Sequence, residues 1–221
     1  MNPLPLHEAA AADVAHLFDS ALPHLVIVGG TVRLGSTSER LARHCEALAR
    51  SLGATTSFFR AAELELPMYA PDRPVRHPVA RAFVREVQRC DGMIVSSPGY
   101  HGGISGLLKN ALDYLEELRV DARPYLHGRA VGCIASAAGW QGANSTLTAL
   151  RSVAHALRGW PTPLGVAVNS AQPLVDAADS LNPDVAGQLE AMVRQVLHLA
   201  GWHPMLAGPC SPATTKEKID G

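Results

Sequence analysis

From residue 25 onward, short apolar runs alternate with segments whose apolar residues recur at helical spacing. The apolar runs predict strands over 25–28, 55–59, 93–97, 130–135 and 164–168. The periodic segments predict helices over 41–52, 79–89, 107–115, 147–157 and 185–199. Strands that alternate with helices form a parallel sheet covered on both faces, and near-continuous apolar strands are typical of such a sheet. The chain is therefore expected to be an α/β protein, a three-layer sandwich around a five-stranded parallel sheet.

The length of 221 residues suits one domain of this kind. We expect an N-terminal extension over 1–24, the α/β domain over 25–200 and a loosely ordered C-terminal tail over 201–221. Val14, Leu17 and Phe18 allow a short amphipathic helix in the extension. That helix is either part of a mobile arm or docked on a neighbouring subunit.

Composition excludes several classes of protein. The formal net charge of −1 argues against a nucleic-acid binder, which needs a basic face. Apolar runs are too short for a transmembrane helix. The first residues lack the basic start of a signal peptide and include acidic residues, so we expect a cytoplasmic protein with no membrane partner.

Cysteine and histidine patterns indicate no metal site. The four cysteines form no C-x-x-C pair, and three of them fall in apolar patterns typical of small core residues. The ten histidines are scattered without the spacing of metal ligands.

In an open parallel sheet, ligands bind beyond the carboxyl ends of the strands, which directs attention to the loops 29–38, 97–104 and 136–143. The first belongs to the stretch "GGTVRLGSTSER" over 29–40. The loop over 29–38 offers one cation, Arg33, and the hydroxyls of Thr31, Ser36, Thr37 and Ser38. A helix is expected to begin near Thr37 or Ser38, and its free N–H groups favour an anion such as a phosphate. The spacing matches neither nucleotide-binding glycine motif, and an ordinary turn with a Ser/Thr helix cap is the alternative.

The second and third loops are rich in glycine and other small residues. In "SSPGYHGGISGLLKNALDYL" over 96–115, glycines surround Tyr100 and His101 and allow a flat ligand to approach the backbone. Tyr100 is placed to stack on a planar ring, or else is an ordinary turn residue. In "SAAGWQGANS" over 136–145, backbone N–H groups are available, and Trp140 either shields the pocket, packs between subunits or lies in a plain surface turn. Together the three loops predict a mononucleotide site.

Two longer patterns carry a resemblance to a known family. The pattern G-S-x-R-x-x-S-x-[NS] occurs as "GGTVRLGSTS", with Thr31 in place of the usual serine. The pattern S-P-x-Y-x-x-x-x-x-x-x-L-K-[NT]-x-[LI]-D occurs as "SPGYHGGISGLLKNALD". Over about residues 24–200 the chain resembles the NAD(P)H-dependent FMN reductases. That resemblance implies a flavodoxin-like fold with strand order 2-1-3-4-5.

The resemblance also implies cofactors and site residues. FMN would be held at its phosphate by the first loop, through Thr31, Arg33, Ser36, Thr37 and Ser38. The flavin ring would be lined by the second loop, at Pro98, Gly99, Tyr100, His101 and Gly102. The other edge of the ring would be bordered by Ser136, Gly139 and Trp140. Relatives often have glutamate or valine at the position of Gly99 and asparagine at that of His101, which affects ring-edge contacts.

The chemistry implied is hydride transfer from NADPH or NADH to FMN, which needs no catalytic side chain and no metal. Lys109 matches a family lysine but equally suits a charge at a helix surface or a subunit contact. Arg73, Arg76 and Arg123 are candidates for a 2′-phosphate, or surface charges. A homodimer or homotetramer is expected, with the helix Ile104–Leu118 as a candidate interface unless its apolar face is buried within one subunit.

Four functions follow from this site. The enzyme passes reduced FMN to a partner monooxygenase or other acceptor, or it retains FMN and reduces a quinone or azo compound. A flavodoxin-like electron carrier is the third, and the charge of −1 speaks against it because carriers are typically strongly acidic. A regulatory domain without cofactor is the fourth, and the intact phosphate-type loop speaks against that.

Overall fold

The computed structural model describes residues 22–73, 75–175 and 180–206, of which 202–206 are described without side chains. The strands are β1 (His24–Gly29), β2 (Thr55–Arg60), β3 (Gly92–Tyr100), β4 (Gly103–Ile104), β5 (Ala130–Ala137), β6 (Trp160–Pro161) and β7 (Val166–Asn169). The α-helices are α2 (Thr37–Ser51), α3 (Pro78–Arg89), α4 (Gly106–Asp113), α5 (Trp140–Ala156) and α6 (Pro183–Leu206). Two short 3-10 helices are η2 (Ala61–Leu64) and η3 (Tyr114–Leu118).

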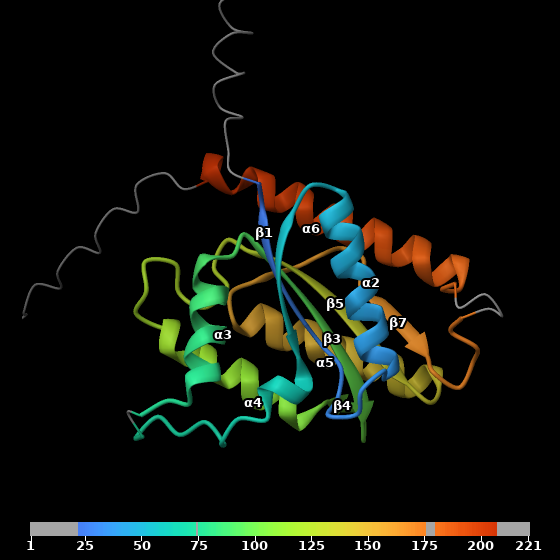
Figure 1. Cartoon of the computed structure of the whole chain (residues 1–221), viewed down its shortest axis with the longest axis horizontal. Coiled ribbons are helices and arrows are strands. Elements are labelled where there is room, and N and C mark those ends of the chain that lie inside the picture. The colour runs from blue at the N-terminus through green and yellow to red at the C-terminus, as the bar shows by residue number, and fades with distance from the viewer. Residues whose placement is uncertain (1–21, 74, 176–179, 207–221) are drawn as a thin grey trace, which may run out of the picture.

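The main sheet is parallel and has the order β2-β1-β3-β5, with β6 and β7 both beside β5 (Figure 1). β6 pairs with the start of β5 at Ala130 and Val131, and β7 pairs with its end over 134–137. In the numbering of the predicted strands this is 2-1-3-4-5, so the flavodoxin-like order is confirmed. β6 was not predicted because two residues are too few to show a strand pattern.

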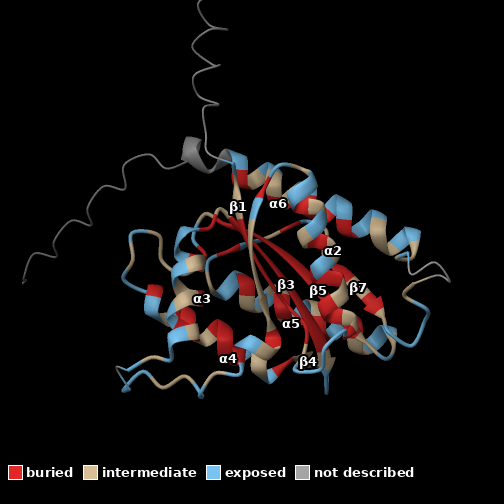
Figure 2. Ribbon diagram, viewed as in Figure 1, coloured by how far each residue is buried: buried red, intermediate tan, exposed pale blue. Residues whose placement is uncertain are grey.

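Helices cover both faces of the sheet. α2 and α6 bury one core with Leu25 and Ile27 of β1, while α3, α4 and α5 bury the other with Val26 and Val28. Successive side chains of a strand point to opposite faces, which explains why a doubly covered strand is apolar at every position. Figure 2 shows the buried residues gathered on the sheet and on the inward sides of the helices.

Three expected boundaries are wrong. α5 begins at Trp140, well before the apolar period at Leu147. The sequence did not show this start, because the buried positions of the first turns are the small Ala143 and the polar Thr146. α6 runs to Leu206, so the tail expected from residue 201 begins inside a helix. The expected helix near 104–118 divides into α4 and η3. The proposed N-terminal amphipathic helix lies outside the described residues.

The apolar face of α4 and η3 belongs to the core of the subunit. Leu108, Leu112, Leu115 and Leu118 are all buried in the cluster shared with α3 and α5. These leucines are therefore unavailable as a subunit interface, and the alternative of burial within one subunit holds.

Asn110, the asparagine of the second pattern, is a structural residue. It is buried, and its side chain accepts a hydrogen bond from Tyr69 N at 2.8 Å and donates to the carbonyls of Leu66 and Pro67. Tyr114 Oη also donates to Pro67 O, at 2.8 Å. These bonds attach the proline-rich connection after η2 to α4 and η3, because a segment with few backbone partners of its own needs side chains to satisfy its polar groups.

Cys45, Cys90 and Cys133 are free thiols in the core, as the apolar patterns predicted. Burial raises the pKa of Cys45 and Cys133 to about 12 and that of Cys90 to about 11. At about pH 8, roughly one thiol in a thousand or fewer is then ionised.

We therefore expect these thiols not to react with a thiol reagent in the native protein at about pH 8, and to react fully after unfolding in urea. A Cys210→Ser background restricts the assay to the three described thiols. Rapid native labelling of any of them, detected by mass spectrometry, would contradict the burial.

Within the residues that the structure describes, the helices lack a stretch both long and apolar enough to span a bilayer.

Candidate functional site

A cavity of about 590 Å³ opens at the carboxyl edge of the sheet, where β1, β3, β5 and β7 all end. This edge is the lower one in Figure 1, near the label of β4. The cavity is lined by Thr31, Val32, Arg33, Ser36, Thr37, Ser38, Pro98, Gly99, Tyr100, Ser136, Ala137, Ala138 and Ser170. Residues from all three predicted loops thus meet in one place.

The first loop leaves β1 at two glycines that have different structural roles. A Cβ on Gly29 would lie 2.3 Å from Ala42 Cβ, so the close approach of α2 to β1 requires a glycine there. Gly30 has φ +103°, a backbone conformation that favours glycine. The chain therefore turns sharply from the strand toward the start of α2.

Ser36 caps α2, and the helix begins at Thr37, within the predicted range. Ser36 Oγ accepts a hydrogen bond from Glu39 N at 3.3 Å, and Ser36 O accepts one from Arg40 N at 2.9 Å. Thr37 and Ser38, which line the cavity, are the first two residues of the helix, where N–H groups lack intrahelical acceptors. The Ser36 cap and the free N–H groups that could bind an anion thus lie in the same turn.

Arg33 supplies the positive charge of this loop. Arg33 is exposed, and its backbone N–H donates a hydrogen bond to Thr31 Oγ1 at 3.0 Å, which closes a tight turn. The guanidinium makes no hydrogen bond or ion pair with any residue that the structure describes. It remains available to an anion, beside the positive end of the α2 dipole.

The second loop is a hairpin, which the sequence did not predict. β3 continues through Pro98 to Tyr100, then β4 returns antiparallel, pairing Gly99 with Ile104 and Tyr100 with Gly103. His101 and Gly102 are the two turn residues, with φ +51° and +83°. Positive φ at both positions is typical of a type I′ turn, in which asparagine and glycine are preferred. His101 and Gly102 thus occupy the two central positions of this turn.

Two contacts fix the hairpin against the rest of the site. Ser97 Oγ accepts from Ser105 N at 3.0 Å and donates to Pro98 O at 2.9 Å, which ties the end of β3 to the start of α4. A Cβ on Gly99 would lie 2.5 Å from Thr146 Oγ1 of α5. A glutamate or valine at this position therefore cannot fit without a shift of α5 or of the hairpin.

Four of the predicted site residues do not line the cavity. His101 and Gly102 form the exposed tip of the hairpin. Gly139, with φ +131°, precedes α5, and Trp140 is the first residue of that helix with 52% of its surface exposed. The third loop is shorter than expected, so Ala137 and Ala138 line the cavity in their place.

Ser170, which also lines the cavity, lies outside the three loops that the sequence pointed to. It follows β7, the last strand, which ends at the same edge. The rule that ligands bind at the carboxyl ends of the strands applies to this strand as well, and would have found it.

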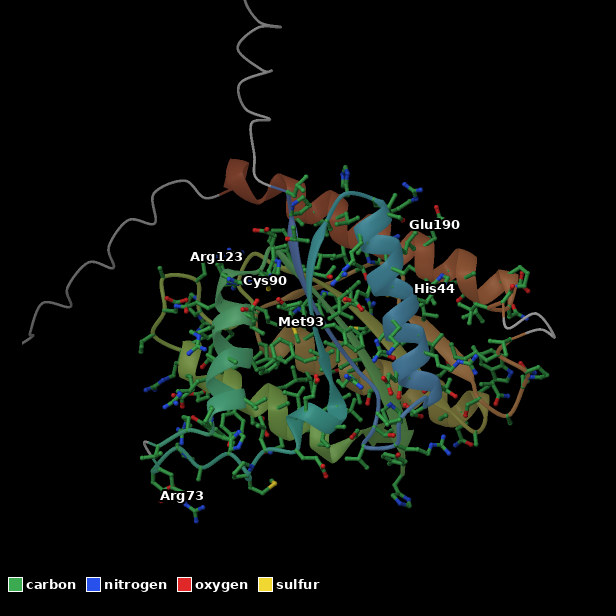
Figure 3. The ribbon with its side chains drawn as sticks, in the orientation of Figure 1. His44, Arg73, Cys90, Met93, Arg123 and Glu190 are labelled. Atoms are coloured by element: carbon green, nitrogen blue, oxygen red, sulfur yellow. The ribbon has the colours of Figure 1, made fainter. Side chains whose placement is uncertain are left out.

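The other candidate cations lie away from the cavity or are already paired. Lys109 is exposed and pairs with Asp113 at 2.6 Å, as expected of a helix-surface charge. Arg76 is not a solvated surface charge, since it pairs with Glu117 at 2.7 Å and stacks on Tyr69. Figure 3 shows Arg123 beside Cys90 at the opposite edge of the sheet, and Arg73 extending away from the fold.

Among the described residues, no three or more His, Cys, Asp or Glu side chains gather where they could hold a metal ion.

The chain is similar to one family of proteins along most of the α/β domain. The family model described as NADPH-dependent FMN reductase matches residues 23–173. Two curated relatives are the NADPH-dependent FMN reductase ArsH of Acidithiobacillus ferrooxidans, 32% identical over 93 residues, and a 2-hydroxy-1,4-benzoquinone reductase of a Burkholderia species, 35% identical over 91 residues. These matches cover 42% and 41% of this chain, and 38% and 48% of the relatives, so the chain spans less than half the length of each.

The fold is similar to that of a solved oxidoreductase of Corynebacterium diphtheriae, with a TM-score of 0.65 and 18% identity. The superposition covers 82% of this chain and 98% of that one. At this identity the likeness concerns the fold alone.

Proposed function

Because the chain belongs to the NADPH-dependent FMN reductase family, we propose that it binds FMN in the cavity at the carboxyl edge of its sheet and reduces it with NADPH or NADH. One observation carries the proposal. Arg33, whose guanidinium has no partner among the described residues, lies with the first turn of α2 in the lining of the cavity.

The donors of the cavity fit the two halves of FMN. The guanidinium of Arg33, the hydroxyls of Thr31 and Ser38 and the start of α2 suit a phosphate. Pro98, Gly99, Tyr100, Ala137 and Ala138 offer apolar surface and backbone to a flat ring. A volume of about 590 Å³ lies in the usual range of cofactor sites.

The flavin, when bound, supplies the hydride chemistry, and the protein supplies binding and orientation. Of the described residues that line the cavity, only Arg33 and Tyr100 have ionisable side chains. The residues of the chain therefore act by position. The first loop would hold the phosphate of FMN, and the hairpin, which Ser97 ties to α4 and which packs on α5, would hold the flavin ring in place for the nicotinamide.

The acceptor of the electrons has two candidates. Reduced FMN is released to a monooxygenase, or FMN is retained and a quinone or azo compound is reduced. The name of the Burkholderia relative supports the second candidate, and so does the exposed side of Tyr100, of which 54% is accessible for a second ring.

The purified protein tests the proposal. We expect NADPH or NADH to be oxidised in the presence of FMN, followed by the loss of nicotinamide absorbance, with a mixture lacking protein as the control. Bound flavin that is bleached without added FMN supports the retained cofactor, and activity only with added FMN supports release to an acceptor. The absence of both flavin binding and nicotinamide oxidation would contradict the proposal.

We further propose a homodimer or homotetramer in which a neighbouring subunit covers the rim of the cavity. Val32, Leu34, Tyr100 and Trp140 are large apolar side chains in or beside its loops, and each is more than half exposed. Adjacent exposed apolar residues are typical of interaction sites. We place the protein in the cytoplasm, since its three described free thiols suit a reducing compartment.

A further inference from the structure

We propose that Glu39 and Arg43 form a positioning pair that shapes the first loop and sets its preference for a phosphorylated flavin. The inference rests on the proposed function. It concerns two residues on α2 that do not line the cavity.

Glu39 is a buried carboxylate directly behind the loop. Its side chain is 5% exposed, and its Oε2 accepts a hydrogen bond from Gly35 N at 3.0 Å. Its own N–H donates to Ser36 Oγ at 3.3 Å. Glu39 therefore holds both Gly35 and Ser36, the last two residues before the helix.

The position of this carboxylate differs from that of an ordinary capping box. A glutamate three residues after the cap usually accepts from the N–H of the capping residue itself. Glu39 reaches one residue further, to Gly35, which lies two residues after Arg33 and has a φ of +68°. The loop that presents Arg33 thus depends on an acceptor at Glu39.

The charge of Glu39 opposes the proposed ligand. It packs directly behind the loop, because a Cβ on Gly30 would lie 3.0 Å from Glu39 Cβ. A negative charge this close to a phosphate site raises the energy of a bound dianion, and burial weakens the screening by water. The loop can favour phosphate only if this charge is balanced.

Arg43 provides the balance. Its Nε and Nη2 donate to Glu39 Oε1 at 3.0 and 2.9 Å, and its guanidinium lies over the ring of Phe58 at 4.9 Å. Both donors meet the same carboxylate oxygen, so the other oxygen, Oε2, is left to Gly35 N. We infer a division of roles, in which the carboxylate shapes the loop and Arg43 removes its electrostatic cost for the phosphate.

The test compares the dissociation constants of FMN and riboflavin, which differ by the phosphate, measured by quenching of flavin fluorescence. In Arg43→Met, FMN is expected to bind on the order of tenfold more weakly, with riboflavin changed less than about twofold. In Glu39→Gln, the amide oxygen still accepts from Gly35, so FMN binding stays within about threefold of wild type. The double variant Glu39→Gln/Arg43→Met is expected to regain most of the lost FMN affinity, because no charge is left unbalanced.

Arg50→Met is the matched control. Arg50 pairs with Glu46 at 2.9 Å with the same four-residue spacing on the same helix, at its far end. Its loss should leave the ratio of the two dissociation constants unchanged. Urea unfolding of every variant separates loss of folding from loss of the phosphate preference.

Equal weakening of FMN and riboflavin in Arg43→Met, or a double variant no better than Arg43→Met, would overturn the inference while leaving the proposed function intact. Wild-type protein that binds no FMN would instead overturn the proposed function, and the inference with it.

Discussion

Replacing Arg129 with methionine is expected to lower the free energy of unfolding by about 3 kcal/mol, because it leaves buried carbonyls without donors. Arg129 is fully buried, and its guanidinium donates to Cys90 O and Tyr125 O, both at 3.0 Å, and to Gln88 O. Gln88 lies in the last turn of α3, and Cys90 is the residue directly after the helix. Carbonyl groups at the end of a helix lack hydrogen-bond partners within the helix. The charge is also favourable there, at the negative end of the helix dipole.

Urea unfolding followed by circular dichroism measures this loss. Arg119→Met is the control, since Arg119 is largely exposed and pairs with Glu116 at 3.4 Å on the surface. That substitution should change stability by less than about 0.5 kcal/mol. If the two variants were equally stable, Arg129 would not have the structural role assigned to it.

Replacing Arg33 with alanine is expected to weaken FMN binding by about 1.5–3 kcal/mol, on the order of tenfold to 150-fold, through loss of a charge-assisted contact. The guanidinium is free of described partners and lines the cavity beside the first turn of α2. Since Arg33 is exposed, the free energy of unfolding should be nearly unchanged.

A flavin fluorescence titration measures the dissociation constant. Arg81→Ala removes the same charge from the exposed face of α3, away from the cavity. It should leave FMN binding within about twofold of wild type at moderate salt. An unchanged constant for Arg33→Ala, or an equal loss in both variants, would remove Arg33 from the phosphate site.

The strand order followed from the resemblance to a known family, and the edge of the sheet at which the cavity opens was predictable from the sequence, but the shapes of the loops were not. Pro98 suggested the end of a strand, since proline cannot donate to a sheet, yet β3 continues through it and turns at His101 and Gly102. The start of α5 was missed because the buried positions of its first turns are Ala143 and Thr146, a small and a polar residue that give little apolar period. Short-range patterns report which side of an element is buried, and these segments are largely solvent-facing.

Glu39 illustrates the same limit within the site. A glutamate on a helix between an apolar strand and an apolar period suggests a solvated charge. Its burial arises because the loop over 30–36 folds back across it, and because Arg43 and Phe58, from different elements, meet beside it. No pattern of neighbouring residues contains that information.

The sequence by itself determined the alternation of strands and helices and the apolar strands of a doubly covered sheet, and its two loop patterns predict the phosphate and ring ends of a flavin site. These depend on periodicity and on residue chemistry, which are local. The tertiary structure alone decided which loop residues reach the cavity, that Ser170 joins them, and that Glu39 is buried with its charge paired to Arg43. Each of these depends on packing between segments far apart in the chain, where contact follows from the whole arrangement of the sheet and its helices.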